Sequence, residues 1–259
     1  MKIIRYRTEQ NESTYGWVQN GKVGAILGEP FNHYRRLEAV TPIERTQLLP
    51  PLVPSKLISI LDNYLFQGKE KQQVPDIPRF FLKPNQSIAG PRDSVIIPAQ
   101  SNELVAQAEL AVVIGKKARW IPLKEAFNFI LGYTCAATFN AKDIELIDGY
   151  PHYRSRCFDT FTALGPWIET NLDPSDIVIT TSVNKSLVHM TTSHEMLFSI
   201  PQLIVFLSSI MTLMPGDVIL TGPTSLGTPV NLNDYLQIEI DGVGILENTI
   251  AIEDRTRSI

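Results

Sequence analysis

The sequence predicts a β-rich fold of the mixed α+β class, with a small N-terminal unit followed by a larger one. Segments with strand character outnumber helical ones, two segments have helical spacing, and a proline-rich stretch separates the first fifty residues from the rest. With 259 residues, of which 44% are hydrophobic, the chain is long enough to bury one sizeable core.

Residues 1–50 are predicted to form the small N-terminal β domain. They alternate in short pieces, and Asn20-Gly21 is the kind of dipeptide that closes a two-residue hairpin. Prolines at positions 50, 51 and 54 then remove backbone donors and restrict their neighbours. We therefore place the domain boundary there, with residues 51–259 as the second domain.

The second domain is predicted to consist mainly of strands, at residues 56–61, 110–114, 177–183, 187–191, 217–221 and 236–240. Two helices interrupt them. Residues 122–130 begin with a proline, and residues 199–213 begin with a serine cap and a proline in the first turn. Their apolar faces are expected to pack into the core instead of lining a ligand site.

Composition excludes several classes of function. The formal net charge of −4 and the pI near 5.6 give no basic surface for nucleic acid. No apolar run approaches the roughly 20 residues that span a bilayer, so we expect no membrane partner and a cytoplasmic location. Cys135 and Cys157 are expected to be buried apolar residues, and the four histidines are too dispersed for a histidine-based metal site.

Several segments occur in the order and spacing of one known family. They are 63–64 (NY), 81–84 (FLKP), 107–115 (QAELAVVIG), 132–134 (GYT), 159–161 (DTF), 164–167 (LGPW) and 215–222 (PGDVILTG). Together they resemble the fumarylacetoacetate hydrolase family over about residues 54–248. The resemblance implies a β-roll, often found as a homodimer, with a loop-built site. The resemblance also implies that a Mg²⁺ or Mn²⁺ ion bound at this site assists the cleavage or rearrangement of small 2-oxo acids and 1,3-diketones.

Two of the three positions at which the family has acidic metal ligands hold uncharged residues in this chain. Gln107 and Glu109 stand where the family has two alternating acidic residues, and Thr138 stands where it has a third. Phe66 occupies the place of a further Asp that some members carry. Because an amide or a hydroxyl cannot offset the charge and dehydration cost of a dication, we expect no metal cofactor. If a metal did bind, Glu109 would be its ligand.

The family's water-activating His-Glu pair corresponds to Gln67 and Glu70. A glutamine can orient a water molecule but cannot accept its proton. Glu70 remains open between two interpretations: a base whose pKa is raised by burial, or a solvated loop carboxylate.

Other family positions suggest how a substrate is held. Arg156 replaces a family Lys, which preserves anion binding and abandons proton transfer. Lys83 is retained and either faces a carboxylate or enolate oxygen or is an ordinary surface lysine. The loop 221–224 reads TGPT instead of the family's TGTP, so another shape is expected, with Thr224 at the substrate. Tyr133, Gln107 and Thr138 complete the predicted substrate-binding set.

Two further carboxylates, Asp143 and Glu145, follow Lys142 near the family's Arg-Asp-x-Gln stretch. We expect them to orient loops and do not rank them as ligands.

The leading hypothesis is an enzyme that isomerises, cyclises or cleaves a small anionic or enolisable carbonyl compound without the family's metal. Its catalytic residues would be Gln67, Glu70, Glu109 and Arg156. Two alternatives stay open. One is a metal-dependent hydrolase, decarboxylase or tautomerase with a weakened site, and the other is a non-catalytic subunit that binds a metabolite or a partner chain.

Overall fold

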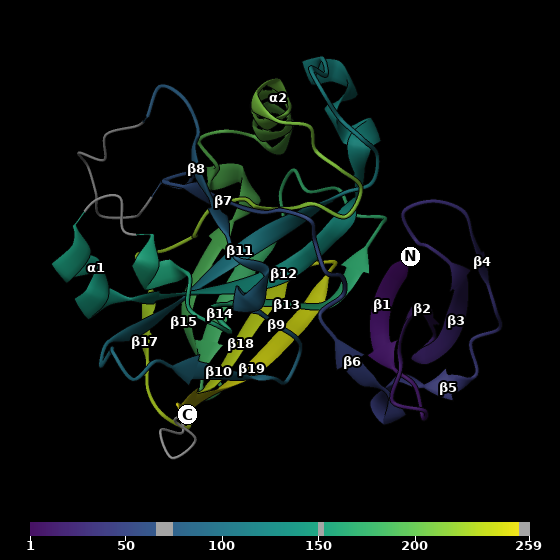
Figure 1. Cartoon of the computed structure of the whole chain (residues 1–259), viewed down its shortest axis with the longest axis horizontal. Helices are drawn as coiled ribbons and strands as arrows, with labels where there is room; N and C mark the ends of the chain where they lie inside the picture. Colours follow the sequence, from purple (N-terminus) through teal and green to yellow (C-terminus); the bar gives the residue numbers. More distant parts are fainter. Residues whose placement is uncertain (66–74, 150–152, 254–259) are drawn as a thin grey trace.

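The computed structural model of the chain describes residues 1–65, 75–149 and 153–253. Strands dominate it, and the helices are few and short (Figure 1). The predicted β-rich mixed fold is therefore confirmed. Gln67 and Glu70 lie outside the described residues.

The larger sheet has 14 strands within the described part of the chain. Their bounds are β1 Lys2–Arg7, β2 Ser13–Gln19, β3 Lys22–Gly28, β4 Tyr34–Arg36, β5 Thr41–Pro42, β6 Gln47–Leu49, β7 Leu57–Leu61, β8 Arg79–Lys83, β9 Ile88–Ala89, β11 Leu104–Ile114, β12 Ile130–Ala141, β13 Thr162–Glu169, β16 Val218–Leu220 and β17 Thr228–Val230. The main path of hydrogen-bonded neighbours is β4-β3-β2-β1-β13-β12-β11-β16-β7-β8. Strand β16 pairs with residues 111–113 of β11, and β17 pairs with residues 104–106 of the same strand.

The smaller sheet has five strands among the described residues, in the order β10-β19-β18-β14-β15. Their bounds are β10 Ser94–Ile97, β14 Val178–Val183, β15 Ser186–Thr192, β18 Tyr235–Ile240 and β19 Gly244–Ile252. It packs on one face of the larger sheet, where apolar side chains of both sheets form the main core.

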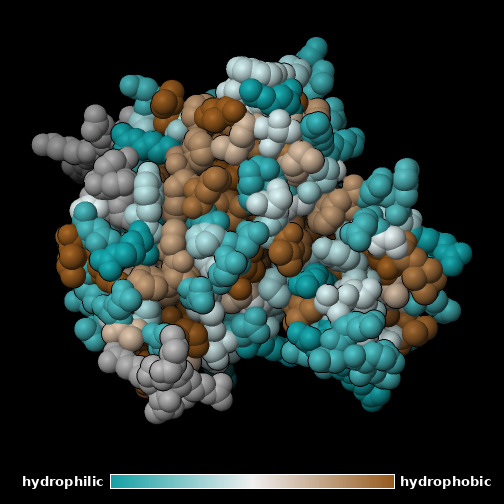
Figure 2. All heavy atoms as spheres, in the orientation of Figure 1, coloured by the Kyte–Doolittle hydropathy of each residue, from teal (hydrophilic) through white to brown (hydrophobic). Residues whose placement is uncertain are grey.

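The N-terminal strands lie to one side of the molecule (Figure 1), yet they continue the larger sheet. Lys2 and Ile3 of β1 pair with Glu169 and Ile168 of β13. The predicted hairpin at Asn20-Gly21 is confirmed, since it joins β2 to β3 with φ angles of 51° and 72°. Figure 2 shows hydrophilic side chains over the lower part of this region and hydrophobic ones on its right side, and apolar side chains also gather over the centre of the same face near β7 and β8.

Strand β11 is buried along its whole length and separates two environments. The side chains at even positions, from Leu104 to Ile114, belong to the main core. On the other face, Ala111 and Val113 belong to a second apolar cluster that includes Ile3 of β1. Because successive side chains of a strand point to opposite faces, Gln107 and Glu109 lie on the same face as Ala111.

Two α-helices and five 3-10 helices occur in the described part of the chain. Helix α2, Ile200–Ile210, begins with a capping box formed by Ser199 and Gln202, and it buries Leu203 and Leu207. The helix predicted at residues 122–130 is a 3-10 helix, η3 Leu123–Phe129, which packs against α2. The other 3-10 helices are η1 Ile43–Arg45, η2 Asn85–Ser87, η4 Arg154–Arg156 and η5 Ser193–Glu195.

Three elements near the site were not predicted from the sequence. Strand β12 is rich in Ala and Thr and is buried on both faces, so it lacks the alternation that marks a half-exposed strand. Strand β13 is buried in the same way except at Trp167. Helix α1, Lys142–Asp148, is a short helix that ends at Gly149 with a φ of 64°. No helix in the described part of the chain is long and apolar enough to cross a membrane.

Candidate active site

The antiparallel pairing of β11 with β12 brings three predicted site residues together. Gln107 is directly opposite Thr138, and Glu109 is opposite Ala136. Residues two apart on a strand share a face, so Gln107, Glu109 and Thr138 form one buried polar patch on the sheet. Each of these three residues is less than 5% exposed to solvent.

Glu109 is the carboxylate at the centre of this patch. Its Oε1 accepts a hydrogen bond from the Thr138 hydroxyl at 2.6 Å, and its Oε2 accepts one from the Gly222 backbone N–H at 2.8 Å. Burial raises the pKa of Glu109, and these two bonds together with the charges of Lys83 and Arg156 only partly oppose that rise. Glu109 is therefore a stronger base than a solvated carboxylate.

The loop after β16 presents the Gly222 N–H to Glu109 because its backbone shape is fixed. Gly222 has a φ of 108°, and a Cβ there would lie 2.9 Å from the Cβ of Asn63. The Asn63 amide donates to the carbonyls of Thr221 and Phe198 at 2.8 and 3.2 Å. Thr221 and Thr224 donate through their hydroxyls to the carbonyls of β11, at 2.9 and 3.1 Å. The loop is thus pinned to the strand that carries Glu109.

Lys83 is a buried cation at the end of β8. Its Nζ donates to the backbone carbonyls of Arg156 and Phe161, the latter at 3.3 Å, and the residue is 5% exposed. Burial lowers the pKa of Lys83 to about 8, although the charges of Cys157 and Glu109 oppose that fall. The structure therefore places Lys83 inside the protein near Glu109, which excludes the interpretation as an ordinary surface lysine.

Arg156 ends the 3-10 helix η4, and its guanidinium joins two side chains. One nitrogen donates to the Gln107 side-chain oxygen at 3.0 Å, and another donates to the Glu145 carboxylate at 3.1 Å. The Gln107 amide in turn donates to the Ser225 carbonyl at 2.9 Å. Arg156 is therefore already ion-paired, and its fork holds Gln107 on one side and Glu145 on the other.

The structure does not bring Tyr133 to this patch. It pairs with Val112 and belongs to the main core, on the face of the sheet opposite Glu109. The prediction that Tyr133 belongs to one substrate-binding set with Gln107 and Thr138 is corrected, because an odd position on β12 cannot share a face with Thr138. Burial raises the pKa of its hydroxyl far above the ordinary value.

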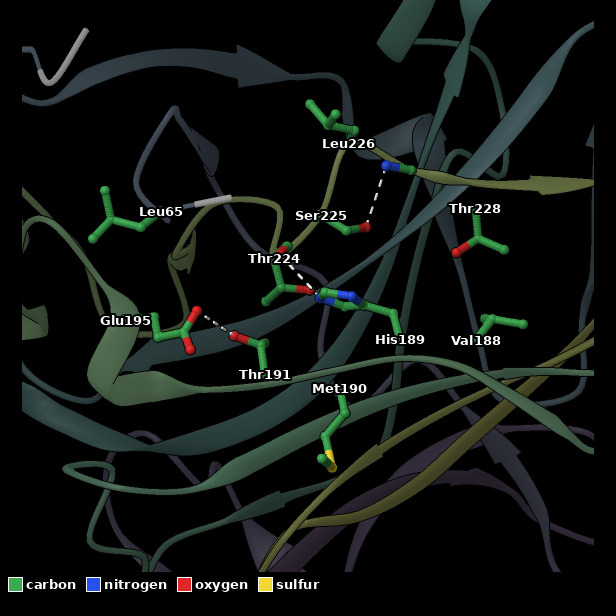
Figure 3. A pocket seen from close by; sticks show the side chains of 11 residues that line it. Leu65, Val188, His189, Met190, Thr191, Glu195, Thr224, Ser225, Leu226 and Thr228 are labelled. Atoms are coloured by element: carbon green, nitrogen blue, oxygen red, sulfur yellow. Dashed lines mark hydrogen bonds between the residues drawn. The ribbon is translucent and has the colours of Figure 1, made fainter. Parts of the chain in front are cut away.

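Thr224 lies at a cavity of about 280 Å³ between the loop that follows β16 and strand β15 (Figure 3). Its hydroxyl is directed to the Ala108 carbonyl, and its own carbonyl is 3.1 Å from Nε2 of His189. Thr191 donates to the Glu195 carboxylate on another wall, at 3.1 Å. Of the predicted site residues that the structure describes, Thr224 alone lines this cavity, and its contact with a substrate stays a prediction.

Glu145 and Cys157 lie beside this patch, although neither was among the predicted site residues. Glu145 is in α1 and accepts from Asn140 at 2.9 Å, from Lys142 and from Arg156. Cys157 is half-buried beside the Lys83 and Arg156 charges, where burial raises its pKa. The available signal for Glu145 was its place three residues after Lys142, a spacing typical of ion pairs on one helical turn.

Comparison with known proteins fixes the family of this chain. The family model for the fumarylacetoacetate (FAA) hydrolase C-terminal domain matches residues 56–251, and an N-terminal model described as Rv2993c-like matches residues 1–51. The chain belongs to the fumarylacetoacetate hydrolase family. The resemblance stated from the sequence is confirmed.

Three relatives illustrate the breadth of this family. An uncharacterized protein of Pyrococcus abyssi is 39% identical over 208 residues, covering 78% of this chain and 92% of that protein. The mitochondrial oxaloacetate tautomerase Fahd2a of Rattus norvegicus is 36% identical over 231 residues, covering 83% and 74%. The crystal structure of a 5-carboxymethyl-2-hydroxymuconate delta-isomerase from Mycobacterium smegmatis superposes with a TM-score of 0.89, at 33% identity, and covers 98% of this chain and 100% of that chain.

Within the described part of the chain, the donor set around Glu109 does not fit the divalent cation that the family implies. Glu109 is the one carboxylate of the patch with Gln107 and Thr138, and both of its oxygens already accept hydrogen bonds. Two cationic side chains, Lys83 and Arg156, lie close enough to influence its ionisation. Across residues 1–65, 75–149 and 153–253, no group of three or more His, Cys, Asp or Glu is placed to hold a metal ion.

Proposed function

We propose that this protein is an enzyme of isomerase, cyclase or lyase type that acts on a small enolisable carbonyl compound and does so without a divalent metal. The observation that carries the proposal is the burial of Glu109 between the Thr138 hydroxyl and the Gly222 N–H, with Lys83 and Arg156 nearby. This arrangement combines a carboxylate of raised pKa with a fixed positive charge.

The proposed chemistry is a proton transfer next to a carbonyl group. Glu109 takes a proton from the carbon adjacent to the carbonyl, and the electrons of the broken C–H bond move to the carbonyl oxygen. Lys83 stabilises the resulting enolate oxygen by its charge and its N–H group. The protonated Glu109 carboxyl exchanges its proton with solvent and returns a proton to a different atom of the enolate, which completes an isomerisation without any oxidant or reductant. A cyclisation or bond cleavage would start from the same enolate.

The roles of the other residues follow from their contacts. Thr138 and Gly222 fix both oxygens of Glu109, while Gln107 and Arg156 hold the neighbouring part of the patch. Lys83 is held by two backbone carbonyls and keeps a third N–H for a ligand. Two relatives are named as a tautomerase and an isomerase, which are enzymes of the same chemical class. Whether Gln67 and Glu70 take part stays a prediction.

Exchange of carbon-bound hydrogen for deuterium tests this function without knowledge of the natural substrate. Pyruvate and 2-oxobutanoate would be followed by proton NMR in D₂O with the protein and excess EDTA. We expect exchange at the carbon next to the carbonyl, at a rate that EDTA does not reduce. Glu109→Gln should abolish it, whereas Glu125→Gln, which removes an exposed carboxylate of η3, should not. Exchange that requires added Mg²⁺ or Mn²⁺ would contradict the metal-free proposal, and a complete lack of exchange would contradict this proton-transfer function.

A further inference from the structure

The charge balance of the site depends on Glu145, a residue that the proposed proton transfer does not use. Glu145 is in α1, and its side chain is 12% exposed. One carboxylate oxygen accepts from Arg156 at 3.1 Å, and the other accepts from Asn140 at 2.9 Å and from Lys142. The residue is thus held in one position by contacts on both oxygens.

Glu145 is ionised at neutral pH. Burial opposes its ionisation, but the hydrogen bond from Lys142 and the charge of Arg156 outweigh burial, so the pKa of Glu145 lies below its ordinary value. The Arg156 side chain is 16% exposed, so water screens this pair only weakly. Glu145 therefore cancels much of the positive charge that Arg156 would otherwise present to a ligand.

The remaining charges of the described residues can be compared in pairs. Lys83 lies near Glu109, and Arg156 is paired with Glu145. Lys142 adds a positive charge, but its side chain is 38% exposed and is partly screened by solvent. The partly screened charge of Lys142 matches one negative charge on a ligand. Among the described residues no further cation is left for a second negative charge, which would face the carboxylates of Glu109 and Glu145.

We infer that Glu145 is a specificity-determining residue that restricts the site to small oxyanions with a single negative charge. This inference rests on the proposed function, because it assumes that a carbonyl compound binds at Lys83 and Arg156. It narrows the substrate class to carbonyl compounds that carry a single negative charge, and it disfavours dicarboxylates.

Two ligands of nearly the same size and shape can test whether the site prefers one negative charge over two. Oxamate and oxalate have similar size and shape, but oxamate carries one negative charge and oxalate carries two at neutral pH. Their dissociation constants would be measured by isothermal titration calorimetry with the full chain in the presence of EDTA. We expect oxamate to bind about tenfold more tightly than oxalate, because one additional unpaired charge in a weakly screened site has an effect of this order.

Substitution of Glu145 provides the second arm of the experiment. Glu145→Gln removes the charge and retains an oxygen for Arg156. The affinity for oxalate relative to that for oxamate should therefore rise by about tenfold. Glu145→Asp keeps the charge and should keep the preference for oxamate, even if its shorter side chain weakens both complexes. Glu125→Gln removes an equal charge at an exposed position and should leave the ratio unchanged.

The outcomes separate this inference from the proposed function. If the unmodified protein prefers oxalate, or if Glu145→Gln binds oxamate with an unchanged ratio, the role of Glu145 is overturned while metal-free oxyanion binding stands. If neither probe binds until Mg²⁺ is added, both the inference and the metal-free function are overturned. The preference of the unmodified protein tests the inference even if Glu145→Gln does not fold.

Discussion

The two faces of strand β11 differ in chemistry, although every residue of the strand is buried. On one face, Leu110 and its neighbours at even positions contribute to the main apolar core. On the other, Gln107 and Glu109 make hydrogen bonds to side chains and backbone groups of other elements. The first face stabilises the protein by removing apolar surface from water, and the second must compensate for burying polar groups.

The candidate active site lies on only one of these two faces, the one that carries Gln107 and Glu109. The face toward the main core carries apolar side chains, whereas the other face carries, beside Ala111 and Val113, a carboxylate of raised pKa near two cations. The cost of burying Glu109 is offset by contacts from Thr138 and Gly222, which come from two different elements. Substitutions on the two faces should therefore affect different properties of the protein.

The largest expected effect is on catalysis, from Glu109→Gln on the polar face. The amide can keep the contacts with Thr138 and Gly222, but it cannot accept a proton. We expect the rate of carbon-bound hydrogen exchange to fall by about 10²–10⁴-fold. A variant that remains folded by circular dichroism and retains more than a tenth of the rate would show that another base acts, with Glu70 as the first candidate.

The next largest effect is on stability, from Leu110→Ala on the apolar face. Leu110 is fully buried in the main core, so the substitution leaves a cavity. We expect the free energy of unfolding to fall by about 2–5 kcal/mol in urea denaturation. The exchange rate per folded molecule should stay within a few-fold of the unmodified protein, and a loss comparable to that of Glu109→Gln would show that the two faces are not separate.

A smaller effect is the pH dependence of oxamate binding, which depends on Lys83. Its ammonium form predominates below a pKa of about 8 and is lost above it, so affinity for an anion should decline as pH rises through that value. Calorimetry from pH 6.5 to 9.5 would show this decline. Lys83→Arg, whose charge persists at high pH, should flatten the profile, and a decline of the same size in that variant would assign it to another group.

The smallest expected effect is a gain of stability in Glu109→Gln at neutral pH. The pKa of Glu109 is raised in the folded state, so its contribution is favourable below the unfolded pKa and is lost as pH rises through the folded value. Removing the buried charge should therefore raise the free energy of unfolding by about 1 kcal/mol at pH 7.5, with a smaller gain at pH 5. A loss of stability at pH 7.5 would show that Lys83 and Arg156 depend on this carboxylate.

The sequence predicted those parts of the fold that have strong local signals. The Asn20-Gly21 turn and the proline and serine at the start of α2 specify their structures through backbone conformation and capping, which involve neighbouring residues only. Strand β12 was not predicted, because its small residues are buried on both faces by distant segments. Burial of that kind depends on the tertiary fold and leaves little periodicity in the sequence.

The part of the site that could be predicted from the sequence is the part in which side chains alternate along a strand. Gln107 and Glu109 share a face as expected, but the opposite placement of Tyr133 required the register of β11 with β12. The ion pair of Arg156 with Glu145 connects a 3-10 helix with α1, and sequence spacing alone did not indicate it. The positive surroundings of Glu109 likewise arise from β8 and η4, which are far apart in the chain.

The central claim is that Lys83 and Arg156 supply the positive charge that a divalent ion supplies elsewhere in the family. Titration of chelator-treated protein with Mn²⁺, followed by calorimetry and by electron paramagnetic resonance of the free ion, tests this claim most directly. The charges around Glu109 predict no binding tighter than about 1 mM. Stoichiometric binding in the micromolar range, lost in Glu109→Gln and retained in Glu125→Gln, would contradict it.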